Sequence, residues 1–519
     1  MHFEFPRNQE VGGRYRSNRH VRANNPTSRT ARRSAFARCA AVSLHRLRVL
    51  HWTSIVTLTL SLYGCGGGSS APAQTYTVGG TVTGLGDESG LVLTNEGSDA
   101  TVVPALAVTF TINTALISGT SYAISVQHAP PGVHCDVVNG TGTIDLANVS
   151  DVEISCVLPL ERTVHSFIAG SSDGYTPNGG LVLASDGNYY GMPYSGGSDG
   201  VGTVYRVTPA GAETVLYSLA SGPNDGAYPF GELIQASDGN LYGMTSGGGA
   251  SISLGAIFKV TLLGAETVLH SFTGVPGDGS DTLTGLVQAG DGNFYGTTQL
   301  GGTGDQGTVF QMTPSGTVSL LYSFSGASFT DPAIPDSTLI VGNDGNLYGT
   351  AIGGGTDGQG VVFQITLDGT FSTLYSFMGG TSDGATPEAK LLLASDGNFY
   401  GTAPNGGTGS VGVVFKVTPT GQETVLHSFG GAPGDGAFPQ GNLIEGSDGN
   451  FFGTTYSGGA NNYGTVYRIT PAGVETVLFS FSGAADGQWL WSGLVETRNG
   501  GLLGTASAGA GHGAVFELY

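Results

Sequence analysis

The unit that decides the fold is DGNFYGTAPNGGTGSVGVVFKVTPTGQETVLHSF, at residues 396–429. It holds three short runs of apolar, aromatic and β-branched residues, and the turn signals DGN and TPTG stand before or between them. Such runs, bounded by Gly, Pro and Asn, are typical of β-strands. A fourth run, LLLAS, precedes the DGN turn at residues 391–395. The unit therefore predicts a small sheet of four antiparallel strands.

This unit recurs along the chain, because its turn triplet is found seven times at intervals of 51 to 53 residues, the last copy being degenerate. The triplets begin at Asp186, Asp238, Asp291, Asp344, Asp396, Asp448 and Asn499. Four short strands in each repeat of about 50 residues are typical of a β-propeller, in which each repeat forms one blade. The sequence therefore predicts an all-β fold with a seven-bladed propeller over residues 161–519.

The ends of the repeat array predict how the ring closes. The last unit stops after its third strand, at residues 513–519, GAVFELY. A segment that matches a fourth strand, ERTVHSF, stands before the first unit at residues 161–167. We expect these two segments to pair, which removes the free sheet edges that would otherwise promote aggregation.

The full repeat reads DGN-[FLY]-YGTT-x-GG…GTVF-x-[VI]TP-x-G-x-ETVLHSF across residues 161–519. This pattern resembles the GloVer tandem repeat of exported bacterial proteins. The resemblance implies a surface location and a propeller fold, and it implies no established activity. The blade layout is also similar to that of NHL-type propellers.

Composition narrows the class of protein further. The chain has 519 residues, of which 90 are Gly and 11% are charged, which argues against a helical bundle or a coiled coil. A hydrophobic content of 39% is enough for a packed core. Residues 1–64 hold 11 of the 18 basic residues, and the remainder carries 7 basic and 37 acidic groups, a net charge of −30. Such a surface repels nucleic acid, so no nucleic-acid partner is predicted.

The N-terminal region is predicted to be an export signal. Residues 49–63, VLHWTSIVTLTLSLY, follow His45, Arg46 and Arg48, and a short apolar run behind basic residues is typical of secretion signals. The run is too short to span a bilayer easily. It ends in LYGC, which resembles a bacterial lipobox and implies that Cys65 carries lipid, although Tyr63 departs from the usual small residue. The alternative is a plain signal peptide followed by a chance cysteine.

Four segments are thereby expected: an extension with a lipoprotein-type signal at 1–64, a linker at 65–74, a β-sandwich at 75–159 and the propeller at 161–519. About seven short strands in 75–159 suggest an immunoglobulin-like module acting as a spacer. Cys39 lies before the cleavage point and Cys65 takes the lipid, which leaves Cys135 and Cys156 as an even pair in an exported domain. We expect these two to form a disulfide.

One Asp precedes the first strand of every unit, and these residues are candidate metal ligands. They are Asp173, Asp225, Asp278, Asp331, Asp383, Asp435 and Asp486. A ring of carboxylates would suit Ca²⁺, which prefers oxygen ligands and is the one cofactor that the sequence suggests. The alternative, which we favour, is that each Asp caps its own loop in an Asx-turn, since a site for one ligand rarely needs seven copies.

Two aromatic residues depart from the repeat and suggest a binding site. Trp489 and Trp491 lie in the loop of the last unit and are the only Trp residues after the predicted signal. The candidate ligand-binding residues are Trp489, Trp491, the residues aligned with Trp489, which are Phe438 and Tyr228, and the nearby Asp435 and Asp486. Aromatic rings beside carboxylates suit sugar faces. The alternative is that the Trp residues plug the closure seam of the ring.

Other polar positions of the repeat are interpreted as structural, and no catalytic residue is predicted. His165, His270 and His427 share one position with Tyr or Phe in other units, which indicates a packing site. Units with a basic residue on the third strand, such as Arg206, have a Glu on the fourth, such as Glu213, which suggests cross-strand ion pairs.

Taken together, the sequence predicts an exported, monomeric protein, anchored by lipid to the outer membrane or cell surface, or else secreted. Its propeller is predicted to be a non-catalytic binding module for a glycan or a surface protein. One alternative is a polysaccharide-cleaving enzyme with loop carboxylates as acid and base. The other is a protein-interaction scaffold. An enzyme should concentrate unique polar residues in two or three units, whereas the Asp residues are spread evenly, which favours binding or scaffolding.

Overall fold

A computed structural model of the chain describes residues 74–85, 91–128, 134–157, 161–168, 170, 173–250, 254–274, 278–326, 331–483, 486–498, 500–509 and 511–519. The predicted signal, Cys39 and Cys65 lie outside these residues, as does Asn499 of the last turn triplet. The described residues form strands, turns and loops, and they contain no helix long and apolar enough to cross a membrane.

The region before the repeats forms two four-stranded sheets that share one core. The first sheet has the order β5 (Thr109–Thr111), β2 (Val78–Thr83), β10 (Val149–Val157) and β8 (His134–Val138), and the second the order β4 (Ser98–Val103), β3 (Leu91–Asn95), β7 (Ser121–His128) and β9 (Thr141–Thr143). In the same region, β1 (Thr75–Tyr76) and β6 (Leu116–Ile117) form a separate two-stranded sheet. Buried Leu91, Leu93, Val152 and Ile154 alternate with more exposed residues along β3 and β10, as expected when one face of each sheet is buried.

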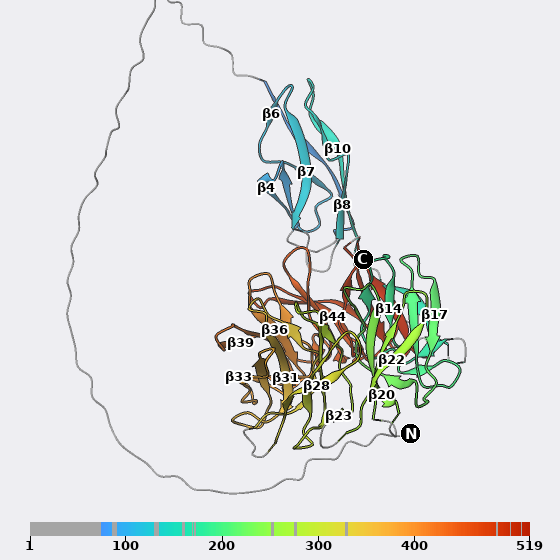
Figure 1. Cartoon of the computed structure of the whole chain (residues 1–519). Helices are drawn as coiled ribbons and strands as arrows, with labels where there is room; N and C mark the ends of the chain where they lie inside the picture. Colours follow the sequence, from blue (N-terminus) through green and yellow to red (C-terminus); the bar gives the residue numbers. More distant parts are fainter. Residues whose placement is uncertain are drawn as a thin grey trace, which may run out of the picture. The chain divides into compact units, whose positions relative to one another are not determined.

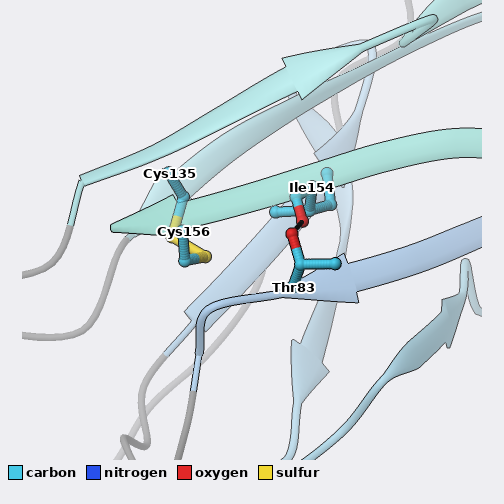
Figure 2. Close-up of a disulfide and its surroundings, with 4 residues drawn as sticks. All are labelled: Thr83, Cys135, Ile154 and Cys156. Carbon is cyan, nitrogen blue, oxygen red and sulfur yellow. Dashed lines mark hydrogen bonds between the residues drawn. A yellow bond between two sulfur atoms is a disulfide. The ribbon is translucent and has the colours of Figure 1, made fainter. Parts of the chain in front are cut away.

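A disulfide joins two neighbouring strands of the first sheet. Cys135 on β8 and Cys156 on β10 are register partners, with Cα atoms 4.0 Å apart, and both side chains are buried (Figure 2). On the other side of β10, the Thr83 hydroxyl of β2 donates to the Ile154 carbonyl oxygen. The predicted Cys135–Cys156 bridge is confirmed.

Each repeat of the C-terminal region forms one sheet, and the described residues contain seven of them. In repeats 1 to 4 the strands are β13 (Val182–Leu183), β14 (Tyr189–Gly191), β16 (Thr203–Val207), β17 (Glu213–Ser218); β19 (Ile234–Gln235), β20 (Leu241–Gly248), β21 (Ala256–Val260), β22 (Glu266–Ser271); β24 (Val287–Gln288), β25 (Phe294–Thr298), β27 (Thr308–Met312), β28 (Val318–Ser323); and β30 (Ile340–Val341), β31 (Leu347–Gly353), β32 (Val361–Ile365), β33 (Phe371–Ser376). In repeats 5 to 7 they are β35 (Leu392–Leu393), β36 (Phe399–Ala403), β38 (Val413–Val417), β39 (Glu423–Ser428); β41 (Ile444–Glu445), β42 (Phe451–Thr455), β44 (Thr465–Ile469), β45 (Glu475–Ser480); and β46 (Val495–Glu496), β47 (Leu502–Ala506), β48 (Ala514–Leu518), β11 (Glu161–Ser166). All pairings within these sheets are antiparallel.

Short ladders also connect the loops that precede the first strand of a repeat with those that follow its second strand. They pair β12 (Gly174–Tyr175) with β15 (Ser195–Gly196), β23 (Gly279–Ser280) with β26 (Leu300–Gly301), β34 (Gly384–Ala385) with β37 (Asn405–Gly406), and β40 (Gly436–Ala437) with β43 (Ser457–Gly458). In repeats 2 and 4, β18 (Gly226–Pro229) and β29 (Ala333–Pro335) pair in the same way with the extended β20 and β31. The loop before the first strand and the loop after the second strand therefore lie at the same end of the strands in each repeat.

The DGN turn is held by the side chain of its Asp. In the first repeat, one carboxylate oxygen of Asp186 accepts a hydrogen bond from the Asn188 N–H, and the other accepts from the Asn188 amide and the Tyr190 hydroxyl. Gly187 has a φ of 84°, which a residue without a Cβ adopts at little cost. These contacts explain why the triplet and the following aromatic residue recur together.

Both faces of every sheet are covered by a neighbouring sheet. Between repeats 3 and 4, for example, Tyr295 and Val309 share a core with Leu347 and Phe363. Equivalent cores join each successive pair of repeats, and one more joins repeat 7 to repeat 1. In Figure 1 the red strands of repeat 7 accordingly lie beside the green β14 of repeat 1.

The two ends of the repeat array pair as the sequence predicts. Strand β11 is antiparallel to β48, and Arg162 lies opposite Glu517 with a 2.6 Å ion pair between their side chains. On β47 of the same sheet, the Thr505 hydroxyl donates to the Gly179 carbonyl oxygen of repeat 1. Repeat 7 is thus completed by a strand from the start of the array.

The predicted ion pairs between the third and fourth strands are wrong. The register places Arg206 opposite Thr214 and Val207 opposite Glu213, so the Arg and the Glu project from opposite faces of the sheet. The same register holds for Lys259, Lys416 and Arg468. Arg206 instead lies close enough to Asp186 to help lower the pKa of that carboxyl, against the raising effect of burial.

The seam between repeat 7 and repeat 1 gives a test of the closure. Phe167 is fully buried there, edge-on to Tyr205 at 5.2 Å, whereas the next residue, Ile168, is 65% exposed. We expect Phe167→Ala to lower the free energy of unfolding by about 3–5 kcal/mol, because it leaves a cavity in this core. Ile168→Ala is the control and should cost less than about 0.5 kcal/mol. Urea unfolding followed by Trp fluorescence measures both, and equal effects would contradict the described seam.

Candidate functional site

The seven Asp residues before the first strands are held within their own loops. Asp225 shows the common pattern: one carboxylate oxygen accepts from the Ala220 N–H and the other from the Gly226 N–H. Asp173, Asp278, Asp383 and Asp435 accept the equivalent backbone bonds, while Asp331 accepts from the Ser325 hydroxyl and Asp486 from Ser482. Over the residues that the structure places, these seven do not gather into a common group of ligand atoms. The geometry favours loop capping over a calcium ring.

A second contact of these Asp residues was not foreseen from the sequence. The repeat position shared by His and Tyr lies eight residues earlier, and its side chain meets the Asp: the Tyr217 hydroxyl donates to Asp225 at 2.9 Å, and His270 Nε2 lies 3.0 Å from Asp278 Oδ2. Burial acts to raise the pKa of Asp278, but the hydrogen bonds from His270 and from the Gly279 N–H lower it overall. The side chain at this repeat position therefore packs in the core and also contacts the Asp of the following loop.

Three acidic side chains from repeats 3 to 5 form a separate group, which we call the acidic cluster: Asp281, Asp336 and Glu388. They lie in the loops that lead into the first strands. The Gln299 amide donates to Asp336 Oδ1, and the Gln440 amide donates to Glu388 Oε2 at 3.2 Å. Burial, followed by the negative charges of Glu388 and Asp281, raises the pKa of Asp336 to about 7. Burial also raises the pKa values of Asp281 and Glu388.

Two residues after Glu388 in the chain, Lys390 takes part in a contact between distant repeats. Its ammonium nitrogen lies 3.0 Å from Glu232 Oε2, and the Asn442 amide donates to Glu232 Oε1 at 2.6 Å. The two partners are 158 and 210 residues from Glu232 in sequence, and the three residues belong to repeats 2, 5 and 6. The residues that precede the first strands therefore bring side chains from non-neighbouring repeats together.

Aromatic side chains form two groups on the same loops. In the first, Tyr194 packs against Tyr228 and Phe230 with ring centroids 5.2 and 6.4 Å apart. In the second, Tyr456 lies parallel to Trp489 at 6.2 Å and edge-on to Trp491 at 4.9 Å. Tyr228 and Trp489 remain 38% and 39% exposed, so both rings are open to a ligand. The core between repeats 7 and 1 is built without these two Trp residues.

The first aromatic group lies beside the acidic cluster. The pKa of the Tyr194 hydroxyl is raised by burial and by the nearby Tyr228 and Asp281. Asp281 also contributes to the raised pKa of Asp336, so the charge of Asp281 acts both on the first aromatic group and on the rest of the acidic cluster. The inner ends of the loops therefore present carboxylates and exposed aromatic rings together.

The backbone at the position of Trp489 is unusual in every repeat. The seven residues at this position are Thr176, Tyr228, Asp281, Ile334, Thr386, Phe438 and Trp489, with φ between 51° and 59°. Non-glycine residues with positive φ cost of order 1–3 kcal/mol. The backbone is held by a hydrogen bond to a loop of the preceding repeat, as from the Phe438 N–H to the Val411 carbonyl oxygen at 2.7 Å. All repeats thus share this strained geometry while the side chain differs.

The structure therefore separates the residues predicted as a binding site. Trp489, Trp491 and Tyr228 lie in the two aromatic groups, Phe438 is half-buried in the equivalent place of repeat 6, and Asp435 and Asp486 cap their loops. The acidic cluster and the ring partners Tyr194 and Tyr456 were not predicted from the sequence. For Asp336 and Glu388 a signal was available, which is one repeat position at which the residue type changes in every copy: Asn178, Phe230, Leu283, Asp336, Glu388, Gln440 and Trp491.

Comparisons with known proteins concern the family and the fold. A family model described as the Gloeobacter/Verrucomicrobia repeat matches residues 158–290 and 281–516. No curated protein matches the chain in sequence.

Solved structures with a similar fold include a streptogramin B lyase, with 14% identity, 70% of this chain and 97% of that chain covered, and a TM-score of 0.48. Others are virginiamycin B lyase from Staphylococcus aureus, with 13% identity, 69% and 98% covered and a TM-score of 0.47, and Pseudomonas aeruginosa periplasmic gluconolactonase, with 16% identity, 65% and 98% covered and a TM-score of 0.39. At these identities and TM-scores, none of the three likenesses indicates an activity for this chain.

The raised pKa of Asp336 predicts a pH-dependent stability. Between pH 3.8, the ordinary pKa of an Asp, and about pH 7, Asp336 in the folded protein keeps a proton that the unfolded chain releases. The stability that this proton contributes is fully present below pH 3.8 and is lost as the pH rises through about 7. Asp336→Asn stays neutral, so its Tm should exceed that of the parent at pH 8, and the gap should close towards pH 4.

Differential scanning fluorimetry of the intact protein at a series of pH values measures this gap. The control is Asp199→Asn, at an exposed loop position of repeat 1, which should change the Tm by the same amount at every pH. An Asp336→Asn variant whose Tm follows the parent's pH dependence would contradict the assignment.

Proposed function

Because the chain belongs to the Gloeobacter/Verrucomicrobia repeat family and folds into a propeller-like all-β structure, we propose that it is an exported surface protein whose propeller binds a glycan. The binding face is the inner ends of the loops that hold the acidic cluster and the two aromatic groups. The seven sheets form a closed seven-bladed ring. This is supported by the β11–β48 pairing and by the core that joins repeat 7 to repeat 1.

The remaining parts of the chain fit this role. The two-sheet region before the repeats acts as an immunoglobulin-like spacer, and its buried Cys135–Cys156 disulfide suits an oxidising compartment outside the cytoplasm. Cys65, outside the described residues, carries the lipid anchor. The protein acts as a monomer, and its strongly acidic surface has no affinity for nucleic acid.

The observation that carries the proposal is the pairing of exposed aromatic rings with carboxylates at one end of the repeats. Sugars present flat C–H faces, which stack on rings such as Trp489, and hydroxyl groups, which donate to carboxylates such as those of the acidic cluster. These residues differ from repeat to repeat, as expected for one asymmetric ligand and not for seven identical ones.

Binding should depend on the ring at position 489. We expect Trp489→Ala to weaken the affinity for the bound glycan at least tenfold, about 1.4 kcal/mol, because the stacking surface is lost. Trp489→Tyr keeps a ring on the same backbone, as Tyr228 does in repeat 2, and should retain most of the affinity. A glycan array identifies the ligand, and isothermal titration calorimetry measures its affinity.

Leu263→Ala is the surface control for this experiment. Leu263 is 95% exposed in the turn between β21 and β22, at the opposite end of the strands from the proposed binding face. Its replacement should leave the affinity for the glycan unchanged. Equal affinities of the Trp489→Ala variant and the parent for every glycan bound would contradict the proposed face. Absence of any bound glycan would redirect the search to protein partners.

A second candidate function, cleavage of the bound glycan, is favoured by the acidic cluster. A carboxyl group whose pKa is about 7, such as that of Asp336, is protonated near neutral pH and can donate its proton to a glycosidic oxygen. A neighbouring carboxylate, such as Glu388, can then activate water or attack the anomeric carbon. A polysaccharide-cleaving enzyme requires one carboxyl group in each of these two roles.

Cleavage is tested by product analysis of the glycan found to bind. If the cluster is catalytic, Asp336→Asn and Glu388→Gln should each lower kcat by about 10²-fold or more, with KM little changed. Mass spectrometry and a reducing-end assay measure the products, and the rate should fall as the pH rises through 7. Unchanged product formation in both variants would contradict this role, whereas binding without any product would leave the non-catalytic function.

A further inference from the structure

Two groups of possible metal ligands lie between neighbouring repeats, and they include no residue of the acidic cluster or of the two aromatic groups. His165 on β11, Asp173 in the loop that follows and Glu213 at the start of β17 bring one ligand atom each within 4.8 Å of one another. His427, Asp435 and Glu475 do the same. The first group joins repeat 7 to repeat 1, and the second joins repeat 5 to repeat 6. We call them seam site A and seam site B.

Several buried polar atoms at these sites have no hydrogen-bond partner among the residues that the structure describes. At site A they are His165 Nε2, Glu213 Oε1 and the Tyr205 hydroxyl, and at site B they are Glu475 Oε1 and the Tyr467 hydroxyl. Both Tyr side chains are fully buried. An unpaired polar atom in the interior costs free energy, so a cluster of them calls for an occupant.

The two Tyr side chains lie near the ligand groups. Burial raises the pKa of both hydroxyls, and the further charges that raise it are those of Glu213 and Asp173 for Tyr205, and those of Glu475 and Asp435 for Tyr467. Tyr205 also stands on the same face of its sheet as Glu213, because its register partner is Val215. Each buried Tyr is therefore close to the two carboxylates of its own site.

The residues of the seam sites occur together and only there among the seven repeats. The third-strand position of Tyr205 and Tyr467 is Phe in the other repeats: Phe258, Phe310, Phe363, Phe415 and Phe516. The seam of His270 has Val318 in place of Glu. The seams of Glu266 and Glu423 have Tyr217 and Tyr375 in place of His. The buried Tyr thus accompanies the combination of His and Glu, which neither packing nor loop capping requires.

We propose that each seam site binds one divalent transition-metal ion, with Zn²⁺ the best match, through the imidazole nitrogen and the two carboxylates. Imidazole and carboxylate ligands suit Zn²⁺, whereas Ca²⁺ prefers oxygen ligands alone. Bonds of about 2.0–2.2 Å in a tetrahedral site place neighbouring ligand atoms about 3.3 Å apart. The His Nε2 and Asp Oδ2 atoms are already 3.4 Å apart at site A and 3.1 Å apart at site B.

The surrounding bonds orient the ligands for this task. Asp435 Oδ1 accepts from the Gly436 N–H and Oδ2 from the Gly430 N–H, which fixes the carboxylate while leaving lone pairs for an ion. The imidazoles of His165 and His427 are held edge-on to Phe167 and Phe429. An ion at site A would fasten β11 to repeat 1, so the closure of the array would depend on metal.

Zinc stoichiometry of the intact protein tests the proposal. Protein treated with EDTA and then dialysed against Zn²⁺ should retain two ions per chain, as measured by plasma mass spectrometry and calorimetric titration. His165→Tyr and His427→Tyr should each reduce the count to one, and the double variant should bind none. Tyr is tolerated at this position, since Tyr217 and Tyr375 occupy it in other repeats and bond to their Asp.

The matched control is His270→Tyr. His270 occupies the same repeat position and contacts Asp278 at 3.0 Å, but its seam lacks the Glu and the buried Tyr, so this variant should keep both ions. X-ray absorption of the zinc-loaded protein should show one nitrogen ligand per ion among oxygens. No saturable zinc, two ions in the double variant, or one ion lost in His270→Tyr would each overturn the proposal.

Discussion

The antiparallel pairing of β11 with β48 is the contact on which the repeat array depends. Every sheet is apolar on both faces, so an open row of repeats would leave one face of the first sheet and one of the last in water. The pairing brings the first strand of the array onto the last sheet, and the core of Phe167, Tyr189 and Val515 then covers both faces. It also delivers His165 to the seam where Asp173 and Glu213 lie.

Most of the fold could be predicted because it is determined by residues that all repeats share. The DGN turn needs its Asp and Gly, the apolar runs give the strands, and the incomplete last unit predicts the pairing of the chain ends. The cross-strand ion pairs failed because register is not visible in a residue pattern. A bulge between Val204 and Tyr205 and the length of the following turn set Arg206 opposite Thr214, and a shift of one residue reverses the face of every side chain.

The candidate site was harder to predict, because repetition directs attention to the residues that all copies share. The shared Asp of each loop serves that loop, whereas the acidic cluster comes from positions where the copies differ, such as Asp336 and Glu388. Trp489 could be recognised because Trp is rare in this chain. Its neighbour Tyr456 could not, since the two lie in different repeats and only the packing of repeats 6 and 7 brings them together.

The inner ends of the repeats explain why shared and variable positions can lie side by side. Adjacent repeats meet there closely: a Cβ at Gly179 would lie 2.5 Å from the Gly231 carbonyl oxygen, so this position is restricted to small residues. The residue before it is free of that contact and varies in every repeat. Repeats 4 to 6 supply Asp336, Glu388 and Gln440, whereas repeats 7 and 2 supply Trp491 and Phe230. Three consecutive repeats therefore present polar side chains at this position, whereas Trp491 and Phe230 stand on either side of Asn178 of repeat 1. A ligand that has both a hydroxyl-rich edge and a flat apolar face would find side chains suited to each.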